Sequence, residues 1–380
     1  MARRVQEREI EVFPEADRLE GFAHPRETAS VFGHDTQRTA LVDAITSGRM
    51  HHAWILSGTA GIGKATLAYR LAETILAPGA ERTGRSSDFG VQPDGPTARQ
   101  VRALSHPRLL VIRRPYDIKA KRFTASIPVD AVRSVKGFLS SRGEAQDWRV
   151  VIVDTADELN INAANALLKS LEEPPPRTVF LLISSEPGRL LNTIRSRCRR
   201  LQFSSLGRQD LKLAVDTALL AGSADAIDAS EFEALEPMAD GSVRRLLSLH
   251  ALKGAELAKA VHTMLGQLPA VDWGKVHKIS DELAPAAAAE RYDVFFDMLL
   301  GSLHQCVRAA SGAPIAGGAP LSKSLIKLSN HMSASARLSD WAEVWDGIQN
   351  AKSQTKSLNL DRKSLILETV SRLAQTAGAR

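Results

Sequence analysis

The chain has 380 residues, 44% of them hydrophobic, and a net charge of +6; this length favours two or three domains over one small core. No apolar run reaches the roughly 18–20 residues that span a bilayer, and the charged residues 1–9 lack the apolar core of a signal peptide. Two cysteines, Cys198 and Cys306, are too few for a disulfide framework or a cysteine-based zinc module. We expect a cytoplasmic protein with no membrane partner. Its basic charge is compatible with nucleic acid nearby but does not demonstrate it.

The first two hundred residues combine short apolar runs with helical patterns. Residues 1–30 are polar and read as an irregular leader, and residues 79–106, rich in Gly, Pro, Ser and Arg, read as a mobile insertion. Helices are expected over about 36–48, 65–74, 130–140 and 160–171. Strands are expected at 53–57, 109–112, 148–153, 179–183 and 201–203. Short apolar strands that alternate with helices indicate a parallel sheet covered on both faces.

The helical patterns continue alone after this α/β region. We predict an α/β plus all-α protein with an irregular leader at 1–30, a parallel-sheet domain at 31–206, a small helical domain at 207–254 and a larger helical domain at 255–380. A break rich in Gly, Pro and Ala interrupts the last domain at 312–320.

A phosphate-binding loop joins the first strand to the helix that follows it. The stretch Gly58-Thr59-Ala60-Gly61-Ile62-Gly63-Lys64-Ala65 matches the Gly-x-x-x-x-Gly-Lys-[Ser/Thr] motif except at its last position. In such a loop, backbone N–H groups beside the glycines surround phosphate oxygens, and Lys64 reaches the outer phosphates. Ala65 stands where a hydroxyl group normally binds Mg²⁺, and Thr66 follows it.

A second nucleotide motif is also incomplete. Four apolar residues lead to Asp154, the kind of strand-terminal acid that holds Mg²⁺ in P-loop ATPases. Hydrolytic enzymes usually place a glutamate next, and Thr155 cannot act as a base near neutral pH. Asp157 and Glu158 lie in the following turn and are no obvious substitutes. The two defects predict that ATP or ADP, with Mg²⁺ only as its companion, can bind without efficient hydrolysis.

Two later segments carry a family resemblance. Asn165 to Pro175 and Leu190 to Cys198 closely resemble AAA+ clamp-loader subunits, and together with the loop region they look like the delta-prime subunits of bacterial DNA polymerase III. In that family Ser196-Arg197-Cys198 corresponds to the arginine-finger motif. Gly241-Ser242-Val243-Arg244-Arg245 resembles the lid-helix motif, with Arg244 at the position that can meet a nucleotide.

The resemblance implies a fold and an assembly. The sheet domain would be an AAA+ P-loop module, followed by a helical lid and a helical collar for oligomerisation. The chain would be a non-motor subunit of the clamp loader, part of the DNA-directed DNA polymerase holoenzyme, with Arg197 acting in trans on a neighbour's ATP. Its partners would be the gamma/tau and delta types of subunit and, through the complex, the sliding clamp and primed DNA.

Some features depart from the family pattern or stay open. Many delta-prime subunits carry a four-cysteine zinc module after the P-loop helix, but residues 79–106 contain no cysteine, so we predict no zinc. Either Ser184 or Ser185 fits the sensor position after the fourth strand. Without the family, Arg197 reads as one member of a solvated basic cluster.

Two other functions compete with the helper role. A self-sufficient AAA+ ATPase, either a motor subunit or a remodelling enzyme, would need Thr66 and Asp157 to replace the missing groups. A P-loop kinase is disfavoured by the Ser-Arg-Cys motif and the long helical tail. The arginines and lysines between Arg108 and Arg122 could contact a DNA backbone, although a solvated face is the commoner role for such a run.

Overall fold

The computed structural model describes residues 14–28, 30–83, 89–140, 147–222, 224–313, 321–335, 338–358 and 360–378. The chain divides into two compact units, one of residues 1–226 with 241–244 and the other of residues 227–240 with 245–380. The three-part division with boundaries near 206 and 254 stays a prediction.

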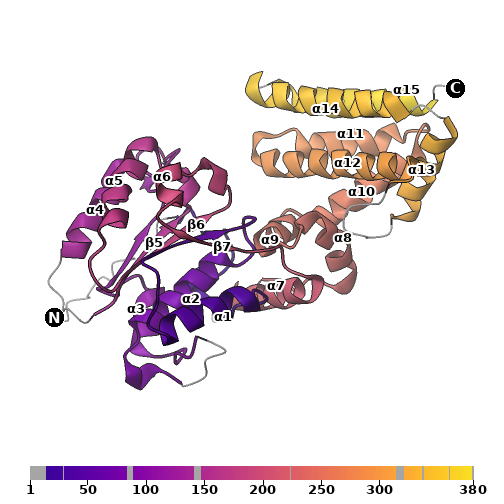
Figure 1. Cartoon of the computed structure of the whole chain (residues 1–380). Coiled ribbons are helices and arrows are strands. Elements are labelled where there is room, and N and C mark those ends of the chain that lie inside the picture. Colours follow the sequence, from indigo (N-terminus) through magenta and orange to yellow (C-terminus); the bar gives the residue numbers. More distant parts are fainter. Residues whose placement is uncertain are drawn as a thin grey trace, which may run out of the picture. The chain divides into compact units, whose positions relative to one another are not determined.

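The first unit is built on a five-stranded parallel sheet of order β2-β5-β6-β1-β7, of which β5, β6 and β7 are labelled in Figure 1. Its strands are β1 (Ala53–Ser57), β2 (Leu109–Ile112), β5 (Arg149–Asp154), β6 (Thr178–Ser184) and β7 (Arg199–Gln202). Every pairing in this sheet is parallel. The predicted parallel-sheet module, with the glycine-rich loop after β1, is therefore confirmed.

The last strand starts earlier than its apolar residues indicate. We expected a strand over 201–203, whereas β7 begins at Arg199, which pairs with Trp54 of β1. The guanidinium of Arg199 lies 4.9 Å from the Trp54 ring centroid. An arginine stacked on an indole can occupy an edge strand, and a search for apolar runs cannot detect it.

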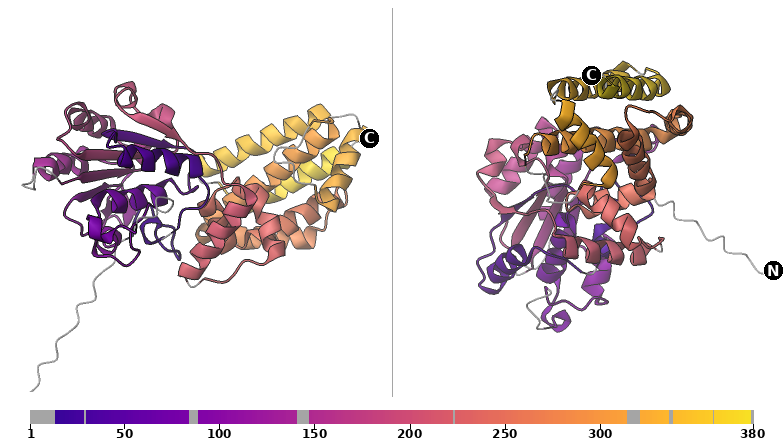
Figure 2. Two further views of the ribbon diagram at one scale, coloured as in Figure 1. Left: turned by 60° about the horizontal axis from the view of Figure 1, so that its bottom comes forward. Right: turned by 90° about the vertical axis from the view of Figure 1, so that its right-hand side faces the viewer.

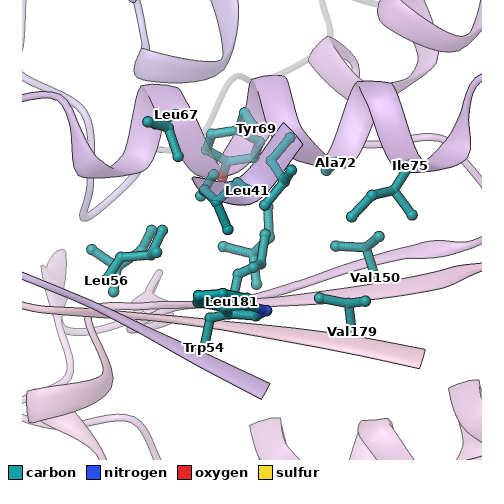
Figure 3. Close-up of a cluster of buried hydrophobic side chains, with 14 of the residues drawn as sticks. Leu41, Trp54, Leu56, Leu67, Tyr69, Ala72, Ile75, Val150, Val179 and Leu181 are labelled. Carbon is teal, nitrogen blue, oxygen red and sulfur yellow. The ribbon is translucent and has the colours of Figure 1, made fainter. Parts of the chain in front are cut away.

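Helices cover both faces of the sheet. The helices α1 (Asp35–Thr46), α2 (Lys64–Leu76) and α3 (Pro96–Arg102) supply one face, and α4 (Val129–Ser140), α5 (Ile161–Glu172) and α6 (Asn192–Arg195) supply the other. Side chains alternate along each strand, so Trp54 and Leu56 of β1 pack towards α2 (Figure 3), whereas Ile55 packs towards α5. Burying one such aliphatic side chain contributes about 1.5–3 kcal/mol.

Part of the expected mobile insertion is packed into the core. Residues 84–88 lie outside the described residues, but Phe89 and Val101 are buried in the cluster beneath α2. Residues 96–102 form α3, and the Glu81 carboxylate accepts a hydrogen bond of 3.0 Å from the Thr97 amide. The prediction of a mobile insertion is thus wrong for this part, because its few apolar residues have no periodic spacing and still reach the core.

The described part of the leader is anchored by charge. Residues 25–27 form one turn of 3₁₀ helix, and the rest is irregular. Arg113, just after β2, donates to Asp17 at 3.0 Å and also pairs with Glu15 at 2.5 Å. His24 lies 2.9 Å from the same Asp17 carboxylate.

The basic segment that follows β2 divides into two groups. Arg108 pairs with Asp147 and Arg114 with Glu158, so these arginines, like Arg113, form ion pairs within the unit. A short hairpin of β3 (Tyr116–Asp117) and β4 (Arg122–Phe123) carries exposed lysines at 119 and 121. Much of the positive charge that the sequence displays is therefore neutralised locally.

Helices make up the remainder of the chain. The first unit also contains α7 (Arg208–Gly222). The others are α8 (Ala229–Ala239), α9 (Val243–Ala251), α10 (Gly254–Gln267), α11 (Trp273–Leu283), α12 (Ala289–Ala310), α13 (Lys323–Ser335), α14 (Leu338–Leu358) and α15 (Arg362–Gly378).

The C-terminal helices form the second unit, drawn in orange and yellow in Figure 2. The helix α12 packs against α10, α13 and α14, and α15 packs against α11 and α14. The helical character predicted after 255 is confirmed, and most of the break at 312–320 lies outside the described residues. No helix in the described part of the chain has the length and apolar character needed to cross a membrane.

Candidate nucleotide loop and arginine finger

The glycine-rich loop lies at the carboxyl edge of the sheet, between β1 and α2. Gly63 precedes α2 with φ +106°, a conformation that other residues rarely adopt. Gly61 has φ +76°, and a Cβ added to it would lie 2.4 Å from Arg244 Cβ. A Cβ on Gly58 would lie 2.6 Å from the carbonyl oxygen of Phe203. The contacts within this unit therefore exclude side chains at Gly58 and Gly61, independently of any bound phosphate.

Lys64 is already hydrogen-bonded inside the loop. Its Nζ donates to the carbonyl oxygens of Gly58 and Thr59, both at 2.6 Å, and lies 3.4 Å from Ser185 Oγ. Burial lowers the pKa of Lys64 to about 8, although the charges of Asp154 and Asp157 act in the opposite direction. The lysine must release these carbonyl groups before it can contact a phosphate.

Of the two candidate sensor serines, only Ser185 contacts the lysine. Ser184 is the last residue of β6, is fully buried and pairs with Ser57 of β1. Ser185 lies just beyond the strand, within 3.4 Å of Lys64 Nζ. The geometry favours Ser185, a choice that the sequence left open.

Asp154 ends β5 at the same edge of the sheet. Burial raises the pKa of its carboxyl group to about 7, and the nearby Asp17 adds to the effect, while Lys64 and Thr155 oppose it. Thr155 Oγ1 donates weakly to Oδ1 at 3.4 Å, and Oδ2 has no hydrogen-bond partner among the described residues. An unpaired carboxylate oxygen beside the loop fits a ligand for Mg²⁺ or its water.

The other half of a magnesium site is missing. Ala65 contributes a methyl group packed partly against the core, and the Thr66 hydroxyl, one position further along α2, makes no side-chain hydrogen bond among the described residues. The residues present therefore fit a nucleotide phosphate and one side of its Mg²⁺. In the described ranges, no group of three or more His, Cys, Asp or Glu side chains could hold a metal ion. The absence of zinc stays a prediction from the sequence.

Asp157 has a structural contact that conflicts with a catalytic role. Its Oδ2 accepts hydrogen bonds from the backbone N–H groups of Ser185 at 2.7 Å and Glu186 at 3.0 Å. The carboxylate thus holds the loop after β6. Glu158 pairs with Arg114 at 2.7 Å. Neither acid is free to replace the carboxylate missing at Thr155.

Arg244 lies against the glycine-rich loop. Its backbone N–H donates to the carbonyl of Gly61 at 3.3 Å, and Nη1 donates to the carbonyl of Asp17 at 3.2 Å. Ser242 Oγ donates to the carbonyl of Ala60 at 2.7 Å. The structure thus brings the lid motif and the loop together, with the leader bonded to the same arginine.

Two residues beside the loop were missed from the sequence. Asp17 bonds to Arg244 through its carbonyl group and raises the pKa of Asp154 through its charge. His34 Nε2 lies 2.8 Å from the Ile62 carbonyl oxygen, and its ring packs on Phe203 with centroids 4.9 Å apart. No sequence pattern marks either residue, because both act through long-range contacts.

Arg197 lies at the opposite, amino edge of the sheet, between α6 and β7. Its Nη2 is 2.7 Å from Glu172 Oε1, and its Nη1 donates to the carbonyl of Thr193 at 2.9 Å. The side chain is 36% exposed. A parallel strand advances about 3.3 Å per residue, so Gly58 lies roughly 13 Å along the sheet from the level of Arg199.

Comparison with known proteins bears out the family resemblance. Residues 33–207 match the family model described as DNA polymerase III, delta subunit. The chain is 40% identical to DNA polymerase III subunit delta-prime of Pseudomonas aeruginosa over 147 residues, which is 39% of this chain and 41% of the relative. It is 35% identical to the Escherichia coli delta-prime subunit over 166 residues, 42% of this chain and 44% of the relative.

Subunits of the tau type also match this chain. DNA polymerase III subunit tau of Salmonella typhimurium is 30% identical over 260 residues, which is 64% of this chain and 36% of the relative. The matched part therefore spans less than half the length of each of these three relatives. The delta-prime matches are the more identical ones, and the tau match extends over more of the chain.

Proposed function

We propose that this chain is a non-motor, stator-like subunit of the DNA polymerase III clamp loader. In this role it would help an ATP-driven assembly to load the sliding clamp onto primed DNA, together with subunits of the gamma/tau and delta types. Homology of the first unit to delta-prime subunits supports this function. The match to the family model lies within that unit. We place the assembly in the cytoplasm.

The position of Arg197 is the observation that carries the proposal. It lies at the amino edge of the sheet, whereas the chain's own phosphate loop lies at the carboxyl edge. An arginine side chain cannot cover the roughly 13 Å of strand between these levels. A guanidinium is always charged and presents a planar fork that suits phosphate oxygens. Its target would therefore be the ATP of a neighbouring subunit.

The chain's own site would bind nucleotide without efficient turnover. Gly58, Gly61 and Gly63 would present the loop backbone to ATP or ADP, and Lys64 would exchange its carbonyl partners for phosphate oxygens. The residues around this loop would be Ala65, Thr66, Asp154 and Arg244.

Magnesium would accompany the nucleotide and neutralise its phosphates. Asp154 is the acid placed to hold the ion or its water, with one free carboxylate oxygen. Ala65 offers no hydroxyl group, and Asp157 is bonded to the amides after β6. The Mg²⁺-binding hydroxyl group and a free catalytic carboxylate are thus both absent from this proposed site. Their absence favours the helper role over an independent ATPase.

The test is reconstitution with candidate gamma/tau and delta subunits, followed by ATPase measurements. We expect a defined complex, and we expect Arg197→Ala to lower ATP hydrolysis at the neighbouring site by about 10³–10⁵-fold, as for other fingers. Arg195→Ala is the matched control, since Arg195 is an exposed arginine nearby that bonds to Asn192 within its own helix. Both variants should keep the wild-type unfolding temperature.

Two results would contradict the proposal. An Arg197→Ala assembly that hydrolyses ATP at the wild-type rate would exclude the finger. Turnover by the isolated chain above about 0.1 s⁻¹, low on the usual enzyme scale, would instead support a self-sufficient AAA+ ATPase.

A further inference from the structure

We propose that Glu172 is a positioning residue for the finger: it holds the Arg197 guanidinium in one orientation, in the free chain and in the assembly, while the remaining N–H donors bind the neighbour's phosphates. This inference rests on the proposed trans role of Arg197. It concerns a carboxylate on a different element, α5, rather than the Ser-Arg-Cys motif itself.

The geometry gives Arg197 two anchors on separate elements. Glu172 Oε1 lies 2.7 Å from Nη2, and the Thr193 carbonyl of α6 accepts from Nη1 at 2.9 Å. A guanidinium has five N–H donors in one plane, so these two bonds orient the group and leave the other donors available. A side chain held in one direction loses less conformational entropy when it binds its target.

The two anchors stand on firmly packed helices. Leu167 and Leu171 of α5 are fully buried in the sheet core, and Asn160 caps the start of that helix by accepting from the Ala163 amide at 2.8 Å. On α6, Ile194, next to Thr193, is likewise fully buried. Glu172 is the last residue of α5. The packing of this helix against the core therefore fixes the position of the Glu172 backbone.

The Glu172–Arg197 ion pair is not needed for folding. Glu172 is 45% exposed and Arg197 36% exposed, and ion pairs at such sites contribute little to stability. Removal of the Glu172 carboxylate should therefore leave folding intact and act on the orientation of Arg197 alone.

The neighbouring acid provides a built-in comparison. Glu173 directly follows Glu172, is exposed, and makes no ion pair among the described residues. Glu172→Gln and Glu173→Gln remove the same charge from the same end of α5. Only the first change should alter the orientation of Arg197.

The experiment measures ATP hydrolysis by the reconstituted loader containing full-length variant chains. We expect Glu172→Gln to lower the maximal rate about fivefold, which corresponds to losing an ion pair worth about 1 kcal/mol, with little change in the apparent KM for ATP. Glu173→Gln should keep the wild-type rate. In an Arg197→Ala background, Glu172→Gln should cause no further loss, because the residue acts only through the arginine.

A second measurement follows the free chain. The NMR signal of the Arg197 side-chain Nε–H should shift in Glu172→Gln and stay in place in Glu173→Gln, while the unfolding temperature stays constant. A purely structural role for Glu172 would change stability without this selective shift.

The possible failures are distinct. If Arg197→Ala abolishes the loader's ATPase but Glu172→Gln behaves like Glu173→Gln, or speeds hydrolysis, the positioning role is excluded and the finger is retained. Losses that add in the double variant would also exclude it. If Arg197→Ala itself leaves the rate unchanged, the proposed function fails first, and the positioning role fails with it.

Discussion

The two edges of the sheet hold their charged groups in opposite ways. At the carboxyl edge, Lys64 bonds to carbonyl groups of its own loop, Arg244 to the leader, and Asp157 to the amides after β6. At the amino edge, Arg197 is half-buried and held by one half-exposed carboxylate and one carbonyl. Lys64, Arg244 and Asp157 beside the glycine-rich loop are thus bonded within the fold, whereas Arg197 is 36% exposed and, in our proposal, acts on a partner.

This difference has a physical consequence for substitution. Buried polar groups at the carboxyl edge have no water to replace a lost partner, so changes there should cost stability. Changes at the amino edge should cost little stability and act on partners instead. The predictions below test this contrast, from the largest expected effect to the smallest.

Gly61→Ala should cause the largest loss of stability. Its new Cβ would lie 2.4 Å from Arg244 Cβ and 2.5 Å from Ser242 Oγ at φ +76°. Overpacking and backbone strain together should lower the free energy of unfolding by roughly 2–4 kcal/mol in urea titrations. Gly137→Ala in α4 is the control, because nothing lies within 4 Å of its added Cβ. Equal unfolding midpoints for the two variants would contradict the close approach of residues 241–244.

Arg113→Met should destabilise the leader side of the same edge by about 2–3 kcal/mol, because Glu15 and Asp17, two acids with low exposure, lose the cation that they share. Burial acts to raise the pKa of Asp17, but His24 and Arg113 outweigh burial and lower it below 3.8. A lowered pKa gives stability that is present above the unfolded value and lost as pH falls. The loss should therefore be full at pH 7 and shrink towards pH 3.

The matched control for that experiment is Arg133→Met. Arg133 forms an ion pair with Asp130 in which both side chains are at least 70% exposed. Its removal should change the free energy of unfolding by less than about 0.5 kcal/mol. A similar loss for both arginines would mean that the Arg113 cluster is no more than a surface contact.

Asp154→Asn should change the pH dependence of stability. Burial raises the pKa of Asp154 from 3.8 to about 7, so the native state binds more protons than the unfolded state between these values. Wild-type stability should fall as pH rises from about 4 to 7. Asparagine removes this slope. The variant should be more stable by about 1–2 kcal/mol at pH 8, because the cost of the buried Asp154 charge exceeds the favourable contact that Lys64 loses. Parallel unfolding curves for the two proteins between pH 5 and 8 would disprove the raised pKa.

Ala65→Ser should have the smallest effect on activity. The variant restores a hydroxyl group beside Lys64, but Thr155 still offers no base, and Asp157 is bonded to two amides. Phosphate release by the isolated chain should stay at background. Robust turnover by this single variant would show that Thr155 matters less than the structure indicates.

The elements of the first unit were largely readable from local sequence. Apolar runs at Trp54 and Val151 gave the strands, and Asn160 marked the start of α5, because burial and capping leave short-range patterns. The errors arose where side chains reach the core without a pattern. Phe89 and Val101 have irregular spacing, and Arg199 extends a strand through its contact with Trp54.

The candidate site divides in the same manner. The motifs predicted the loop, Asp154, Arg244 and Arg197 as site residues, because phosphate chemistry restricts residue type and spacing. They could not identify Asp17, His34 or Glu172, whose contacts link distant parts of the sequence. Nor could they separate Ser184 from Ser185, which only the contact with Lys64 distinguishes.

The sequence by itself determined the fold class, and it predicted the clamp-loader resemblance and the two departures from hydrolytic motifs at Ala65 and Thr155, since each depends on residue identity at fixed spacing. Only the tertiary structure decided which charged side chains are hydrogen-bonded within the fold and which are partly exposed. The order of strands places Arg197 at the edge opposite its own loop, and packing bonds Lys64, Asp157 and Arg244 within the unit. Hydrogen bonding and burial depend on residues that are distant in the sequence, and local sequence patterns do not identify those residues.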